Sequence, residues 1–312
     1  MKQILTPLSQ RLGLRYPIIA APMFLISNKE MLVAAAEAGI LASMPSLNCR
    51  TPDSLRETLE WVRARTNGPF GINLTIKLTD PQRLELDVQT CLDLQVPVLI
   101  TSYGNPTEIA RRAHARGLTV LHDVIRLDHA LKAQAAGVDA VIAVGAGAGG
   151  HAGTISPYVL VPWLKENLKI PVIAAGCIAT GQQIAASLAL GAEAVYMGTR
   201  FIASAECGAP DEYKKMVVGG SPDDLIYTDA VSGVHANFLR ATVPGAELPN
   251  AKAAEAGAAQ AAIQEHGAKR WKDIWSAGQG IALAKDIKPM AEIVADLVRE
   301  YEQTVSALPR LG

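Results

Sequence analysis

The region around His151 combines the residue types that chemistry at a ligand site needs. Five of the nine residues from 145 to 153 are glycine, and so many glycines cost backbone entropy unless the backbone must approach a ligand closely. His151 lies inside this run, and a neutral imidazole can accept or donate a proton near physiological pH. We therefore predict a ligand-binding loop that includes Gly149 and Gly150, with His151 as a catalytic residue. The competing interpretation is a flexible loop.

Two later segments have the composition of a phosphate-binding site. Ala175-Gly176-Cys177 and Met197-Gly198-Thr199 each end a short apolar run. Small residues there let backbone N–H groups reach a phosphate, and Thr199 adds a hydroxyl donor. The competing interpretation is that both glycines only form tight turns. Two such segments in succession favour phosphate binding.

Several other residues at the ends of apolar runs are candidate ligand contacts. Asn73 stands in an apolar run, where an unpaired amide is costly, so we expect it to hydrogen-bond a ligand or else a backbone group. Ala21-Pro22-Met23 follow the first run, and His122-Asp123 end the fifth. Cys177 is not predicted to be a nucleophile, because no base is recognisable beside it.

The elements that position these residues alternate between short apolar runs and amphipathic segments. The runs are too apolar to alternate, which is typical of parallel strands buried on both faces. Several amphipathic segments end in glycine, as helices often do, at Gly39, Gly117, Gly137 and Gly191. The eight apolar runs are 16–20, 39–43, 70–74, 97–101, 118–122, 140–143, 171–175 and 194–198.

Eight strand–helix units predict an α/β fold, a (β/α)8 TIM barrel, with an open doubly wound sheet as the competing architecture. The active site of such a barrel lies at the C-terminal ends of the strands, where the candidate residues fall. Residues 207–275 break the rhythm and contain an alanine-rich helical stretch, Ala251–His266. We predict that they form a small, mainly helical domain on the substrate side, inserted into a barrel of residues 1–206 and 276–312. Ile287–Ala307 is expected to be the last outer helix.

The composition excludes several classes of protein. Hydrophobic residues make up 49% and charged residues 19% of the 312 residues, which favours a globular protein over a disordered one. The net charge of -1 argues against a nucleic-acid partner, and no apolar stretch is long enough to span a membrane. The four cysteines lack metal-ligand spacing, so no metal is expected. Without a recognisable secretion signal, we expect a cytoplasmic protein.

With these elements in view, the sequence resembles the nitronate monooxygenases, formerly called 2-nitropropane dioxygenases. The resemblance covers nearly the whole chain. The segments that carry it are Ala21–Met23, Gly71–Asn73, Gly137–Ala140, Ala148–Gly153, Ile173–Gly176, Met197–Phe201, Val231–Leu239 and Trp275–Gly280.

The resemblance implies an enzyme that binds FMN, with the phosphate at the loops after the seventh and eighth strands and His151 facing the flavin. It implies that alkyl nitronates, as small-molecule substrates, react with O2 to give a carbonyl compound and nitrite. A homodimer is kept open. The expected FMN contacts, from the residues and the resemblance together, are Ala21, Pro22, Met23, Asn73, Asp123, Gly149, Gly150, Ala175, Gly176, Cys177, Met197, Gly198, Thr199 and Gln279.

Two positions depart from the pattern of many relatives. Val144 replaces a Gln or Glu, and Cys177 replaces a Gly. Both are compatible with FMN, but position 144 faces the site, so the identity of the substrate stays open. The alternatives are an NAD(P)H-dependent flavin reductase of the same barrel group (an enoyl-acyl-carrier-protein reductase or an NADH:quinone reductase), a flavin-free phosphate-binding isomerase or lyase, and a non-catalytic ligand-binding barrel.

Overall fold

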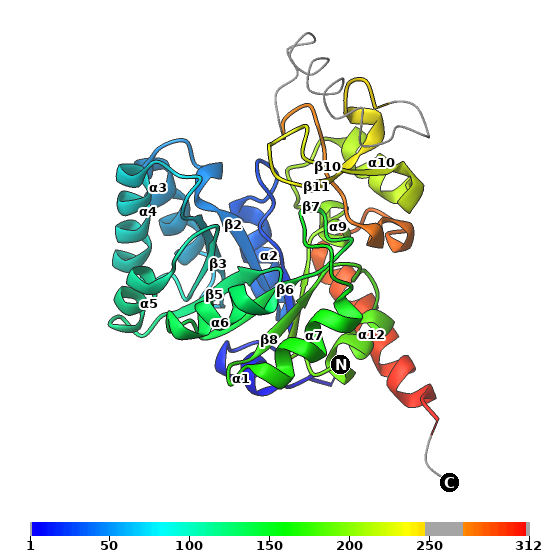
Figure 1. Ribbon diagram of the computed structural model, residues 1–312, viewed down its shortest axis with the longest axis horizontal. Helices are drawn as coiled ribbons and strands as arrows, with labels where there is room; N and C mark the ends of the chain where they lie inside the picture. Colours follow the sequence, from blue (N-terminus) through cyan, green and yellow to red (C-terminus); the bar gives the residue numbers. More distant parts are fainter. Residues whose placement is uncertain (1, 247–270, 310–312) are drawn as a thin grey trace.

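A computed structural model describes residues 2–246 and 271–309, and their parallel strands form a closed barrel (Figure 1). Strand β9 pairs with β1 to close it. The predicted (β/α)8 barrel is therefore confirmed and the open sheet is excluded. In order around the barrel the strands are β1 Ile18–Ala20, β2 Leu41–Pro45, β3 Gly71–Thr75, β4 Val98–Ser102, β5 Thr119–Val124, β6 Ala140–Val144, β8 Val172–Ala175 and β9 Ala194–Met197.

Burial on both faces holds the barrel strands together. Successive side chains of a strand point to opposite faces, so they pack alternately against the outer helices and inside the barrel. Inside, Ile19 and Leu121 belong to one apolar cluster. Helix α1 (Pro7–Arg11) contributes Leu8 to this cluster and closes the lower end of the barrel (Figure 1). Each strand begins within two residues of the apolar run that predicted it.

The outer helices begin and end at signals that the sequence carries. Thr51 and Thr180 cap their helices through reciprocal capping boxes. The glycines predicted to end helices all have positive φ, which L side chains rarely adopt: Gly39, Gly117, Gly137 and Gly191. The helices are α2 Lys29–Ala38, α3 Pro52–Arg63, α4 Pro81–Asp93, α5 Thr107–His114, α6 Leu127–Ala135, α7 Pro157–Asn167, α8 Gly181–Ala189 and α12 Met290–Ala307.

The chain between β9 and α12 departs from the alternation of strands and helices. Helix α12 packs against α8 and α2, so it is the last outer helix, as predicted. Before it come α9 Thr199–Ile202, α10 Asp211–Gly219, β10 Leu225–Thr228, β11 Ala236–Leu239 and several 3-10 turns, η2 Pro222–Asp224, η3 Arg240–Thr242 and η5 Gln279–Leu283. The helical stretch predicted at 251–266 lies outside the described residues.

A small antiparallel sheet is the feature of this region that the sequence did not predict. Strand β11 pairs with β10 on one side and with β7 (Gly150–His151), from the loop after β6, on the other. Its third strand comes from a distant loop, so no local pattern announces it. Figure 1 shows this sheet and α10 at the end of the barrel opposite α1. The domain boundaries drawn from the sequence stay predictions.

No helix within residues 2–246 and 271–309 is long and apolar enough to cross a membrane. The cytoplasmic location and the homodimer stay predictions from the sequence.

Replacing Gly137 by Ala isolates the backbone conformation that ends α6. Gly137 has a φ of +84°, and a Cβ there would meet no atom within 4 Å, so the cost is conformational. We expect Gly137→Ala to lower the free energy of unfolding by about 1–2 kcal/mol, measured by chemical denaturation. Gly219→Ala is the matched control, because Gly219 has equal space but ends a right-handed helix. It should leave stability unchanged or raise it, and equal losses in both variants would refute the conformational explanation.

Candidate active site

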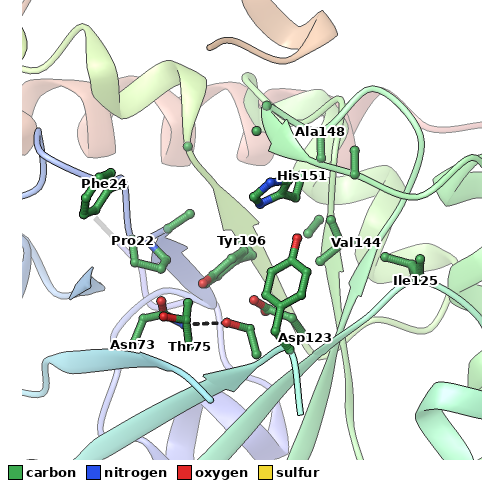
Figure 2. Close-up of a pocket in the computed structure, with 18 of the residues that line it drawn as sticks. Pro22, Phe24, Asn73, Thr75, Asp123, Ile125, Val144, Ala148, His151 and Tyr196 are labelled. Carbon is green, nitrogen blue, oxygen red and sulfur yellow. Dashed lines mark hydrogen bonds between the residues drawn. The ribbon is translucent and has the colours of Figure 1, made fainter. Parts of the chain in front are cut away.

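A large cavity opens at the C-terminal end of the barrel, where the sequence predicted the active site. Its volume is about 1130 Å³, and Figure 2 shows His151, Tyr196 and Asp123 around it. Strand ends, the loop after β6 and the described part of the chain between β9 and α12 (residues 198–246 and 271–289, called the inserted segment) all contribute to its wall. The predicted site residues that line it are Ala21, Pro22, Met23, Asn73, Asp123, Gly149, Gly150, His151, Ala175, Gly176, Cys177, Gly198 and Thr199.

Two predicted site residues, Met197 and Gln279, lie next to the cavity but do not line it. The Met197 side chain is buried between the barrel and the helices, because it alternates with Tyr196, which points inside the barrel. The backbone N–H of Gln279 donates to the Gly147 carbonyl oxygen at 2.8 Å. Its side-chain Oε1 accepts from the Cys177 thiol at 3.6 Å. Neither side chain is part of the cavity lining.

The inserted segment fixes the loop that carries His151. Gly150 and His151 form β7, and they pair with Asn237 and Ala236 of β11. The Asn237 side chain also donates to the Ala148 carbonyl oxygen at 2.7 Å. Two residues of the loop therefore form a paired strand, and a further side-chain bond holds Ala148, so the interpretation as a flexible loop is not supported.

The glycines of the site serve two different purposes. A Cβ on Gly149 would lie 2.8 Å from the amide nitrogen of Gly278, so this position has no room for a side chain. Gly150 and Gly198 instead face open space, because a Cβ on either would meet nothing nearer than 3.9 Å. A side chain at these two positions would therefore fill part of the cavity, where a ligand can now reach the backbone.

The His151 ring is held between two aromatic rings and a hydroxyl. Its Nε2 lies 3.1 Å from Ser232 Oγ, and the Ser232 hydroxyl donates to the Val234 carbonyl oxygen at 3.0 Å. Because that proton is committed, Nε2–H donates to Ser232 and the imidazole lone pair resides on Nδ1. Tyr103 and Trp271 make T-shaped contacts with the ring, each at 5.3 Å between centroids. Burial lowers the pKa of His151, so the imidazole is neutral and basic at neutral pH.

A layer of polar side chains forms the floor of the cavity. Asn73 donates from Nδ2 to the Ile100 carbonyl oxygen at 3.1 Å and to Ser102 Oγ at 3.3 Å (Figure 2), so the backbone partner foreseen as an alternative exists. Asp123 and Tyr196 lie on the same floor. Burial raises the pKa of Asp123 to about 7. Burial, and then the nearby Asp123 carboxyl, raise the pKa of Tyr196.

Two cavity residues hold a backbone conformation that favours glycine. Tyr103 has a φ of 55° and Cys177 a φ of 58°, and strain of this kind concentrates at ligand sites. The Cys177 thiol donates to the Ala146 carbonyl oxygen at 3.3 Å, and burial raises its pKa. Cys177 is therefore a protonated thiol, in agreement with the prediction that it is not a nucleophile.

Thr199 and His122 have contrasting environments. Thr199 Oγ1 accepts from the Gly278 amide at 2.8 Å, which leaves its own hydroxyl proton available to a ligand. His122 alternates with Asp123 along β5 and so faces the other side of the strand. Its Nδ1 lies 2.8 Å from Thr101 Oγ1, and burial lowers its pKa to about 4. The geometry favours a ligand contact for Thr199 and a structural role for His122.

Several residues that line the cavity or hold His151 are not among those predicted from the sequence. Tyr196 lies on the last strand, and period-two alternation turns it toward the barrel interior. Ser232 and Trp271 come from the inserted segment, and nothing in their local sequence connects them with His151. No group of three or more His, Cys, Asp or Glu within the described ranges is arranged to hold a metal ion.

Comparison with known proteins finds relatives along almost the whole chain. The family model described as nitronate monooxygenase matches residues 6–300. A nitronate monooxygenase from Paraburkholderia phytofirmans is 30% identical, over 98% of this chain and 97% of the relative. The structure of FabK from Thermotoga maritima is 33% identical, with a TM-score of 0.84 over 97% of this chain and 98% of FabK. A nitroalkane oxidase from Streptomyces ansochromogenes is 28% identical, with a TM-score of 0.81 over 97% of this chain and all of that one (100%).

Removing the Asn237 side chain tests how the inserted segment holds the His151 loop. Asn237→Ala loses the bond to Ala148, so we expect faster hydrogen–deuterium exchange in residues 145–153 and a loss of about 1 kcal/mol in unfolding free energy. The control is Asn167→Ala, which removes an exposed bond to the Trp163 carbonyl oxygen and should leave exchange in the loop unchanged. Unaltered exchange in Asn237→Ala would mean that the backbone pairing alone holds the loop.

Proposed function

Because the chain belongs to the nitronate monooxygenase family, we propose that it oxidises alkyl nitronates with O2 to carbonyl compounds and nitrite. At the level of the family it is an FMN-dependent oxidoreductase that acts on a small molecule. The observation that carries the proposal is the neutral imidazole of His151, held at a cavity into which glycine backbone opens.

The residues at the barrel mouth fit a flat, phosphorylated cofactor. Gly150 and Gly198 leave space that a side chain would fill, and Thr199 keeps a hydroxyl proton for an acceptor. We assign the FMN phosphate to the loops after β8 and β9, around Gly176 and Gly198, since barrels commonly bind phosphate there. When bound, FMN accepts the electrons that leave the substrate.

His151 handles the proton at the substrate carbon. With a neutral nitroalkane, the Nδ1 lone pair accepts the proton from the carbon next to the nitro group. The resulting imidazolium keeps its Nε2–H bond to Ser232, and its charge stabilises the nitronate anion beside it. A nitronate that binds directly has no such proton to lose, so it places less demand on His151.

The cavity wall favours an alkyl substituent on the substrate. Phe24, Ile125 and Val144 line it with apolar side chains (Figure 2). Burying an apolar group against them is favourable by about 25 cal/mol per Å² of surface removed from water. Many relatives carry Gln or Glu where this chain has Val144, which offers no polar contact. The apolar side chain supports a substrate whose alkyl group carries no polar substituent.

An NAD(P)H-dependent flavin reductase is the second candidate. The identity with FabK, 33%, exceeds the 28% identity with the nitroalkane oxidase, so the family name alone does not decide between them. Membership of a family of FMN-dependent enzymes argues against a flavin-free isomerase or lyase and against a non-catalytic barrel.

Two measurements on the purified flavoprotein separate the candidates. We expect oxygen uptake and nitrite release with ethylnitronate and propyl-2-nitronate. We also expect that anaerobic mixing with NADH or NADPH leaves the visible flavin absorbance in place. Rapid bleaching by either nucleotide, together with no oxygen uptake on nitronates, would establish the reductase.

Replacing His151 should affect turnover of a neutral nitroalkane much more than turnover of the matching nitronate. His151→Asn removes the proton acceptor, so we expect kcat/KM for a neutral nitroalkane to fall by about 10²–10⁴-fold. The value for the matching nitronate should fall far less, and flavin content should be retained. His114→Gln, at the opposite end of the barrel where His114 pairs with Asp139, is the control and should change neither. Equal losses for both substrates would argue against proton transfer to His151.

The pH dependence of kcat/KM should report the titration of His151. Burial lowers the pKa of His151, and below that pKa the imidazole is protonated and cannot accept a proton. The kcat/KM for a nitroalkane should therefore rise with pH along an acid limb whose midpoint lies below about pH 6.5, the ordinary pKa of histidine. An acid limb that extends above neutral pH would contradict this assignment.

A further inference from the structure

A polar atom of Asp123 on the cavity floor has no hydrogen-bond partner among the described residues. It is the carboxyl oxygen Oδ1, which is shielded from solvent. A buried polar group left unpaired costs about 1–3 kcal/mol. Because Asp123 lines the cavity, a bound ligand is the natural source of the missing partner.

No cation forms an ion pair with Asp123 within the described residues. Asp123 points into the barrel from β5, and the inward side chain at the end of the neighbouring strand β6 is Val144, which is apolar (Figure 2). The titratable groups whose pKa the Asp123 carboxyl raises are Tyr103, after β4, and Tyr196, on β9. Burial raises the pKa of both phenols, so both are neutral. His151 lies on the cavity wall and is neutral as well.

We propose that Asp123 binds the flavin in its protonated form, donating a hydrogen bond from its carboxyl group to a ring acceptor of bound FMN. This inference rests on the FMN binding described above. The acceptors of the flavin ring are its two carbonyl oxygens and the nitrogens N1 and N5, whereas N3–H is a donor. An ionised carboxylate is acceptor-only and would repel them, whereas a carboxylic acid has one O–H to donate. Val144 cannot supply such a donor from the adjacent strand.

The environment of Asp123 makes this protonation state accessible at ordinary pH. Burial raises its pKa to about 7, so protonated and ionised forms coexist near neutrality. A ligand that accepts the carboxyl proton in a hydrogen bond binds the protonated form and raises this pKa further. FMN affinity is then full below the pKa of the free protein. It falls by up to about tenfold per pH unit above it.

Dissociation of FMN from the holoenzyme at different pH values tests the proposal. Released FMN is measured by its fluorescence after dilution, for the wild type and for Asp123→Asn, whose amide donates at every pH. Dividing the dissociation constant of the wild type by that of Asp123→Asn cancels the effect of FMN phosphate titration, which both proteins share. We expect this ratio to be constant below about pH 7 and to rise by up to about tenfold per unit above it. Riboflavin has no phosphate to titrate, so its dissociation constant from the wild type should show the same rise without division by the value for the variant.

Matched variants give the experiment its controls. Asp123→Ala should weaken FMN binding at every pH, and Tyr196→Phe should keep the pH dependence. Asp128→Asn, which removes an exposed carboxylate paired with Arg126, should change neither. Identical pH dependence in the wild type and Asp123→Asn, or a changed KM for nitronate with unchanged FMN release, would overturn the proposal.

The two proposals fail in distinguishable ways. A flavoprotein with the expected FMN release but no nitronate turnover would refute the proposed substrate and leave the role of Asp123 supported. A protein that holds no flavin would overturn both.

Discussion

The antiparallel pairing of β7 with β11 is the interaction on which the rest of the site depends. It joins the loop after the sixth barrel strand to a segment inserted after the last one. Without it, the glycine-rich loop would have no regular backbone partners on that side, and its entropy would oppose a fixed position for His151. The same segment supplies Ser232, which selects the tautomer of the imidazole, and Trp271, which contacts the ring from one side.

Desolvation shifts the pKa values of two cavity residues, His151 and Asp123, in opposite directions, and in both cases it favours the uncharged form. It lowers the pKa of His151 and raises that of Asp123, because burial always disfavours the charged form. Near neutral pH both groups therefore shift toward their uncharged forms. In the proposed roles one acts as a base and the other as a hydrogen-bond donor. Both roles then follow from one physical cause and need no dedicated counter-ion.

Periodic features of the molecule were predictable from the sequence, and contacts between distant segments were not. The barrel strands followed from apolar runs, and the helix ends followed from glycines whose positive φ the structure confirms, such as Gly137. His151 and Asn73 could be assigned to the cavity end because strand order fixes which ends meet there. Alternation of side chains along β9 turns Tyr196 toward the barrel interior and Met197 toward the outer helices, so the expected contact of Met197 with FMN stays a prediction. Ser232 and the β7–β11 sheet depend on pairing over some eighty residues, which no local pattern encodes.

The position of the inserted segment in the sequence also has a consequence for folding during synthesis. All eight barrel strands precede residue 198, yet Gly278, which packs against Gly149, and Trp271, which contacts the His151 ring, come much later. During synthesis from the N-terminus, the ribosome delivers a complete set of strands well before it delivers the segments that complete the site. A nascent chain can therefore close its barrel while His151 still lacks its surroundings, so assembly of the fold and acquisition of the active site become separate events in time.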